Sequence, residues 1–171
     1  GLWLIQCVRN EIEKKFSFSE LSKMAEKNQD FPSRRNVDDI RFMAPESMIK
    51  EIRSFCAETG QKIPEEIGEI AAVIYHSISD RYDKIKKEIE DITGKKYNKI
   101  HIIGGGSNAE FLNRLTAIKT GNTVYAGPIE ATATGNLLVR MIKNGEFENL
   151  EKAKKSVYES FEVKKFEPDV L

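Results

Sequence analysis

Three successive glycines, Gly104-Gly105-Gly106, are the feature of this sequence with the clearest chemical use. They follow a short β-branched run and precede a segment with helical spacing. A turn without β-carbons lets a phosphate or a flat ligand approach the backbone, and the following helix offers free N–H groups. The P-loop lysine is missing, and Asn108 and Ala109 replace the third glycine of G-x-G-x-x-G. On this feature alone, a nucleotide contact and a plain tight turn both stay open.

The stretch Gly127–Asn136, which reads GPIEATATGN, is the second candidate. Small side chains at Ala131, Ala133 and Gly135 allow a helix to lie very close to its neighbour. A glycine inside a helix costs roughly 1 kcal/mol relative to alanine, so close packing is a sufficient reason for it. We therefore expect this helix to pack beneath a sheet, with Glu130 as a cap or a ligand contact.

The remaining candidates suggest structural roles. His101 falls within a predicted strand and is expected to be a core or edge histidine. His76, on a long helix, is expected to face solvent or a missing partner. Asp38 and Asp39 are more typical of a solvated loop than of a cation site. No Ser-His-Asp or Cys-His set follows from the chain order, and no carboxylate stands out as a general base. We therefore predict no catalytic residue.

Composition narrows the class of protein. The 171 residues are 40% apolar and 32% charged, with 27 basic and 27 acidic side chains. This length suits one domain, and the balanced charge gives no overall basic surface for nucleic acid or anionic lipid. No apolar run approaches the ~20 residues that span a bilayer. The two cysteines, Cys7 and Cys56, exclude a disulfide framework. We expect a cytoplasmic protein without nucleic-acid or membrane partners and without a metal site.

The elements that must position these residues are mostly helices. Apolar spacing in the first part predicts helices over residues 2–15, 20–27, 47–58 and 63–93, with a polar surface loop over 28–44. The later pattern predicts buried strands at 99–103 and 123–126, helices at 108–119, 130–143 and 150–158, and an extended or frayed tail at 161–171. The expected fold is therefore α/β, with a helix-rich layer against a small sheet.

Four stretches together resemble the C-terminal domain of the FGGY family of carbohydrate kinases. They are GLWLIQ at 1–6, RFMAPESM at 41–48 leading to ETGQ at 58–61, IIGGGS at 102–107 with the following Leu-Asn, and AGPIEATATGN at 126–136. The glycine triplet belongs to many kinases of the sugar-kinase and actin superfamily. The first and last stretches are typical of the branch that phosphorylates the 1-hydroxyl of L-rhamnulose with MgATP. The likeness implies a ribonuclease-H-like, nucleotide-binding domain over residues 1–171, truncated at its N-terminal side.

The resemblance also implies which residues contact the nucleotide. Gly105 would approach it through its backbone, and Gln6 would be a second contact. Gly104 and Gly106 would shape the turn around it. The family usually has Ser-Gln-Asn after the triplet, whereas this chain has Ser-Asn-Ala, so Asn108 is the residue that would replace the contact to adenine.

Several functional parts of the family have no counterpart in this sequence. The catalytic aspartate of a His-Asp-Thr-Ala stretch, the phosphate loop that holds Mg²⁺ and a sugar-contacting asparagine are all missing. The chain also opens without methionine, on an apolar run, so we expect a piece of a longer protein. The resemblance thus implies half of an ATP cleft, with Mg²⁺ held mainly, and the sugar bound, by an absent N-terminal domain. We expect the chain alone to be inactive.

Two alternatives stay open. One is another FGGY kinase, for fuculose or a related deoxysugar. The other is a non-catalytic helical interaction module in which the glycine turns are only turns. Two short strands make a marginal sheet, so we also expect self-association through a sheet edge or the first helix.

Overall fold

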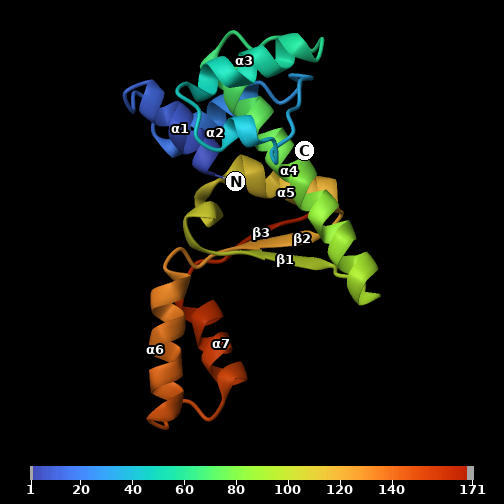
Figure 1. The fold of residues 1–171 in the computed structure, drawn as a ribbon. Helices are drawn as coiled ribbons and strands as arrows, with labels where there is room; N and C mark the ends of the chain where they lie inside the picture. The colour runs from blue at the N-terminus through green and yellow to red at the C-terminus, as the bar shows by residue number, and fades with distance from the viewer. Residues whose placement is uncertain (1, 169–171) are drawn as a thin grey trace.

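Helices make up most of the molecule, and a small sheet crosses its middle (Figure 1). A computed structural model describes residues 2–168, so Gly1 and the last part of the predicted tail, residues 169–171, lie outside the described residues. The first half contains α1 (Trp3–Glu11), α2 (Phe18–Lys27), a 3-10 turn η1 (Ile40–Phe42), α3 (Met48–Glu58) and α4 (Ile67–Thr93). The second half contains β1 (Lys99–Ile102), a 3-10 turn η2 (Gly104–Asn108), α5 (Glu110–Thr120), β2 (Thr123–Ala126), α6 (Ala131–Lys143), α7 (Leu150–Ser160) and β3 (Lys164–Phe166). The expected helix-rich α/β arrangement is therefore confirmed.

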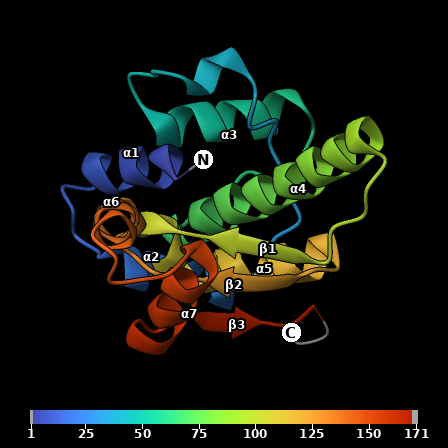
Figure 2. The ribbon, with the colours of Figure 1, turned by 90° about the horizontal axis from the view of Figure 1, so that it is seen from below.

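The sheet has the order β1-β2-β3. β1 and β2 are parallel, with Ile102 opposite Ala126, and α5 forms the crossover between them. β3 then pairs antiparallel with β2 and places Lys164 opposite the same Ala126. α4 and α5 lie on one side of the sheet, and α6 and α7 lie on the other (Figures 1 and 2). The carboxyl ends of the two parallel strands therefore meet at one edge, next to the glycine triplet.

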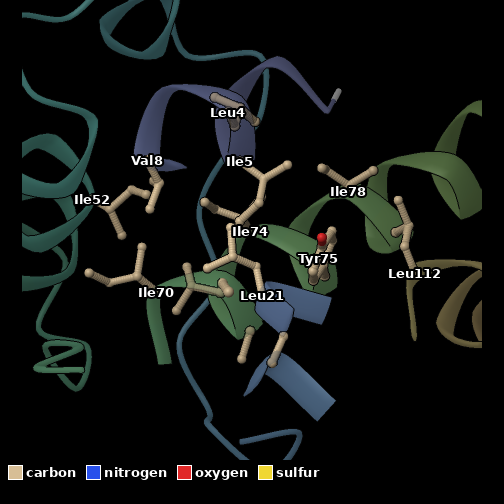
Figure 3. Packing of buried hydrophobic residues seen from close by; sticks show 14 of the residues in the cluster. Leu4, Ile5, Val8, Leu21, Ile52, Ile70, Ile74, Tyr75, Ile78 and Leu112 are labelled. Carbon is tan, nitrogen blue, oxygen red and sulfur yellow. The ribbon is translucent and has the colours of Figure 1, made fainter. Parts of the chain in front are cut away.

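The core surrounds the first half of α4 (Figure 3). Ile70, Ile74 and Ile78 recur at a spacing of four and are almost fully buried. Leu21 of α2 and Leu112 of α5 close this cluster from two further helices. Burial of such aliphatic side chains stabilises the fold by roughly 1.5–3 kcal/mol each. The core therefore fixes α1, α2 and α5 relative to one another.

The last turns of α4 do not follow the predicted pattern. Ile89 and Ile92 continue the apolar spacing that predicts this helix, but they are 44% and 84% exposed because the helix continues past the core. His76 was expected to face solvent, and this prediction is wrong as well. It is 5% exposed, and its Nε2 lies 2.8 Å from the carbonyl oxygen of Gln29. Burial is the main reason why the pKa of His76 falls below its usual value.

Helix ends explain most differences in element boundaries. Ser17 accepts a hydrogen bond from the backbone N–H of Glu20, whose carboxylate accepts one from the Ser17 N–H, which forms a capping box. α2 therefore begins at Phe18 rather than at residue 20. α1 ends at Glu11, because Glu13 and the next residue have positive φ angles.

The predicted burial is wrong in three further places. The segment 28–44 is not a surface loop throughout, because Phe31, Arg35 and Phe42 are buried. The strand β1 was expected to be buried, but its residues alternate between exposed and half-buried, since β1 pairs with only one strand among the described residues. α6 has no buried residue, so it does not pack beneath the sheet, and instead it extends away from it beside α7 (Figure 1).

Candidate functional site

The glycine triplet forms a turn that is held from two sides. The backbone N–H of Gly104 donates to the carbonyl oxygen of Pro128 at 3.1 Å, which ties the end of β1 to the segment after β2. The Ser107 hydroxyl donates to the Gly104 carbonyl oxygen at 2.7 Å. The buried side-chain amide of Asn113 on α5 donates to the Ser107 carbonyl oxygen at 2.9 Å. These bonds fix the turn between a strand and a helix before any ligand binds.

The three glycines have different surroundings. Gly104 has a φ of +73°, a conformation that side chains with a β-carbon adopt only at a cost. A β-carbon on Gly106 would lie 3.3 Å from Ile102 Cγ2 and 3.6 Å from Leu2 Cδ1, so this residue packs against the molecule. A β-carbon on Gly105 would meet nothing within 4 Å. Gly104 and Gly106 therefore shape the turn, and Gly105 presents bare backbone to open space.

A cavity of about 760 Å³ lies in front of Gly105. Its walls come from α1, the start of α2, α4, the glycine turn, the start of α5, and β3. The lining residues are Leu2, Trp3, Ile5, Gln6, Phe18, Ser19, Tyr75, Gly105, Asn108, Ala109, Glu110 and Lys164. The volume is in the range of cofactor and substrate pockets, which combine apolar walls with a few polar groups. The structure thus brings Gln6, Gly105 and Asn108 together in one cavity. Gly104 and Gly106 support the turn without lining it.

Polar groups of this cavity are held by neighbours. The Gln6 side-chain amide donates to the Asn10 side-chain oxygen one turn further along α1, at 2.9 Å. Across the cavity, the Lys164 ammonium donates to the carboxylate of Glu110. This hydrogen bond lowers the pKa of Glu110 and raises that of Lys164, so both side chains stay charged at neutral pH.

The aromatic side chains of the cavity did not emerge from the sequence as binding residues. Trp3 and Phe18 are 56% and 44% exposed, although both have large apolar surfaces. They lie at the starts of α1 and α2, and both line this cavity. An exposed aromatic face suits the flat ring of a nucleobase. No motif marks Trp3 as a binding residue, and the signal that could have identified it is its position at the exposed start of α1.

The histidines do not contribute to this cavity. His76 is enclosed by the core, and His101 on β1 stacks on the ring of Tyr125 with centroids 5.2 Å apart. Among residues 2–168, no three His, Cys, Asp or Glu side chains are grouped as ligands for a metal ion. The same part of the chain contains no helix long and apolar enough to cross a membrane.

A smaller cavity of about 360 Å³ adjoins the first. Gly127, Pro128 and Glu130 line it from the segment after β2. Asn108 and Lys164 line both cavities. A β-carbon on Gly127 would lie 2.7 Å from the Glu162 carbonyl oxygen, so the chain just before β3 packs directly on this segment.

Comparisons with known proteins show the family of this chain. The family model for the FGGY family of carbohydrate kinases, C-terminal domain, matches residues 1–143. The chain therefore belongs to the FGGY carbohydrate kinases, whose C-terminal domain has the ribonuclease-H-like fold of actin and the sugar kinases.

Three similar proteins within this class are rhamnulokinases. A rhamnulokinase of Bacillus subtilis is 46% identical over 168 residues, which cover 98% of this chain and 35% of that protein. A rhamnulokinase of Halalkalibacterium halodurans is 45% identical over 166 residues, covering 97% of this chain and 35% of that protein. A rhamnulokinase of Bacteroides thetaiotaomicron is 34% identical over 169 residues, covering 98% and 34%. The chain thus spans about a third of the length of these relatives.

Proposed function

We propose that this chain is the nucleotide-binding C-terminal part of a kinase that phosphorylates the 1-hydroxyl of L-rhamnulose with ATP in the cytoplasm. The observation that carries the proposal is the cavity in which Gln6, Gly105 and Asn108 meet. Similarity to rhamnulokinases over nearly the whole chain supports the choice of sugar.

The chemistry of the cavity fits a nucleotide. Bare backbone at Gly105 lets the ligand lie against the turn without meeting a side chain. Gln6 and Asn108 offer amide groups that donate and accept hydrogen bonds. Trp3 and Phe18 supply apolar surface for the base. Adenine nucleotide is therefore the ligand that we assign to this cavity.

Phosphoryl transfer needs more than this cavity. The oxygen of the sugar 1-hydroxyl forms a bond to the γ-phosphorus as the bond to the bridging oxygen breaks, and ADP leaves. Catalysis depends on positioning and on neutralising the developing charge. In this proposal the base, the sugar site and the Mg²⁺ ligands come from an N-terminal part, and the chain described here holds the nucleotide. A coupled assay of the chain alone with L-rhamnulose and MgATP should stay at background.

Calorimetric titration of the chain with ADP tests the binding step. We expect weak binding at millimolar ADP, since half of a cleft retains only part of the affinity, and each 1.4 kcal/mol lost weakens binding about tenfold. No heat of binding and no chemical-shift change at millimolar ADP would contradict the assignment of the cavity in this chain, but would leave the kinase assignment of the full-length protein standing. A panel of L-rhamnulose and L-fuculose with the full-length kinase tests the sugar separately.

A further inference from the structure

Lys164 occupies a position that the family model does not cover. It lies on β3, beyond the residues 1–143 that the family model matches. Its side chain nevertheless lines the cavity that contains Gln6 and Gly105, as well as the smaller cavity beside Gly127. Lys164 therefore lies where the two cavities adjoin.

Two independent contacts fix this position. The backbone of Lys164 pairs with Ala126 in the antiparallel ladder between β3 and β2. Its side chain reaches across to the first turn of α5 and binds Glu110. The next residue, Lys165, points to the opposite face of the strand, as successive strand residues do, and pairs with Glu167 instead. The register of β3 thus selects one of two adjacent lysines for the cavity.

The charges around the cavity give Lys164 a distinct role. Among the described residues that line the larger cavity, Lys164 carries the one positive side chain and Glu110 the one negative side chain. A nucleotide that enters brings negatively charged phosphates close to the Glu110 carboxylate, which would repel them. The ammonium group has three donors, of which Glu110 needs one, and it can therefore donate to phosphate oxygens at the same time.

We propose that Lys164 binds the phosphate groups of the nucleotide, with Glu110 holding its ammonium group at the place where the two cavities adjoin. The inference rests on the proposed function and names a further binding residue of the same site. In a purely structural role, the ion pair between Lys164 and Glu110 would only link β3 to α5, and Lys164 would not contact the nucleotide. The two roles differ in what the removal of each partner does to nucleotide affinity.

Three variants separate these roles: Lys164→Met, Glu110→Gln and the control Lys165→Met. The control removes an equally exposed lysine, since the side chains of Lys164 and Lys165 are 46% and 53% exposed. Affinity for ADP and for adenosine is measured by calorimetry at low and high salt, with a thermal melt of each variant. We expect Lys164→Met to weaken ADP binding about three- to fivefold and to leave adenosine binding within about twofold. Glu110→Gln should strengthen ADP binding, because it removes the repelling charge while the amide oxygen of glutamine still accepts a hydrogen bond from the Lys164 ammonium group.

The control should bind both ligands like the parent chain, and added salt should reduce the loss caused by Lys164→Met. The inference is overturned if Lys164→Met binds ADP like the control, or if it loses ADP and adenosine equally. A loss of ADP binding in Glu110→Gln together with a lower melting temperature would show a structural tie instead, which also overturns it. Failure of the parent chain to bind either ligand would remove the proposed function and this inference together, whereas the other outcomes leave the proposed function in place.

Discussion

Replacement of Gly105 by valine is the sharpest test of the site, because the structure separates its effect on folding from its effect on binding. The φ of Gly105 lies outside the left-handed region, and a β-carbon there meets nothing within 4 Å. Gly105→Val should therefore change the free energy of unfolding by no more than about 0.5 kcal/mol, as substitutions at open surface positions do. The added methyl groups would occupy the space in front of the bare backbone, where the nucleotide is proposed to lie.

The expected loss of binding can be estimated from contact distances. A nucleotide that lies against glycine backbone has atoms at about 3.5–4 Å, which leaves no room for the branched carbons of valine. The ligand must then move away or lose its contacts, so we expect ADP affinity to fall at least about tenfold, or about 1.4 kcal/mol. The assay is calorimetric titration of ADP into the parent chain and the variant, with thermal melts of both.

Two further glycines serve as controls. Gly135 on α6 also has nothing within 4 Å, so Gly135→Val adds the same bulk away from the cavity and should not alter ADP binding. Gly104→Ala, unlike Gly105→Val, should lower the melting temperature. The φ of +73° at Gly104 costs a non-glycine residue about 1 kcal/mol. For a chain of this length that is a fall of roughly 2–4 °C in melting temperature. If folded Gly105→Val binds ADP as well as the parent chain, Gly105 is only a turn residue.

Three other predictions concern stability and association. Ile74→Ala should lower the free energy of unfolding by about 2–5 kcal/mol in a urea titration, whereas Ile92→Ala, at a position 84% exposed, should change it little. Hydrogen bonds from the Lys96 ammonium and the Tyr97 backbone N–H lower the pKa of Glu90 to about 2. Its stabilisation is therefore present above the unfolded pKa of about 4.3 and is lost as pH falls towards 2, and Glu90→Gln should flatten this part of a plot of stability against pH. Finally, β1 has an edge without a partner strand in the described chain, next to an apolar cavity of about 620 Å³. Because an unpaired strand edge favours association, we expect dimers or larger species in light scattering. A monomer at high concentration would contradict this prediction.

Local signals in the sequence predicted most helices and strands, but they did not predict which of the side chains are buried. The apolar spacing of α4 predicted the helix, and Gly94 ends it in a left-handed conformation. The same spacing failed to predict which side chains are enclosed. The turns from Ile70 to Ser79 are buried on every side, because α1, α2, α3 and α5 surround them, so His76 is enclosed with its apolar neighbours. Periodicity describes one face of a helix and cannot show that several helices surround it.

The segment 28–44 also shows that local sequence does not predict burial, because it contains the buried Arg35. The polar composition of residues 28–44 predicted a solvated segment, but Arg35 is 5% exposed and its guanidinium group lies over the ring of Phe42, 4.1 Å from the centroid. Burial lowers the pKa of Arg35 to about 10, which still leaves it charged at neutral pH. The contact joins two residues of one loop through a cation–π interaction. Composition alone carries no signal for that pairing.

The candidate site combines segments that differ in how far the sequence could predict them. Gln6 and Gly105 follow from motifs that belong to the family, and the fold then brings α1 and the glycine turn to one cavity. β3 carries no comparable motif, because its three residues, KKF, become a strand only by pairing with β2. Side chains alternate between the two faces of a strand, so a shift of register by one residue would place Lys165 in the cavity in place of Lys164. No local property of two adjacent lysines distinguishes them. The pairing of β3 with β2 therefore decides which lysine lines the cavity. For this reason, the comparison of Lys164→Met with Lys165→Met tests the register of β3 and the binding site together.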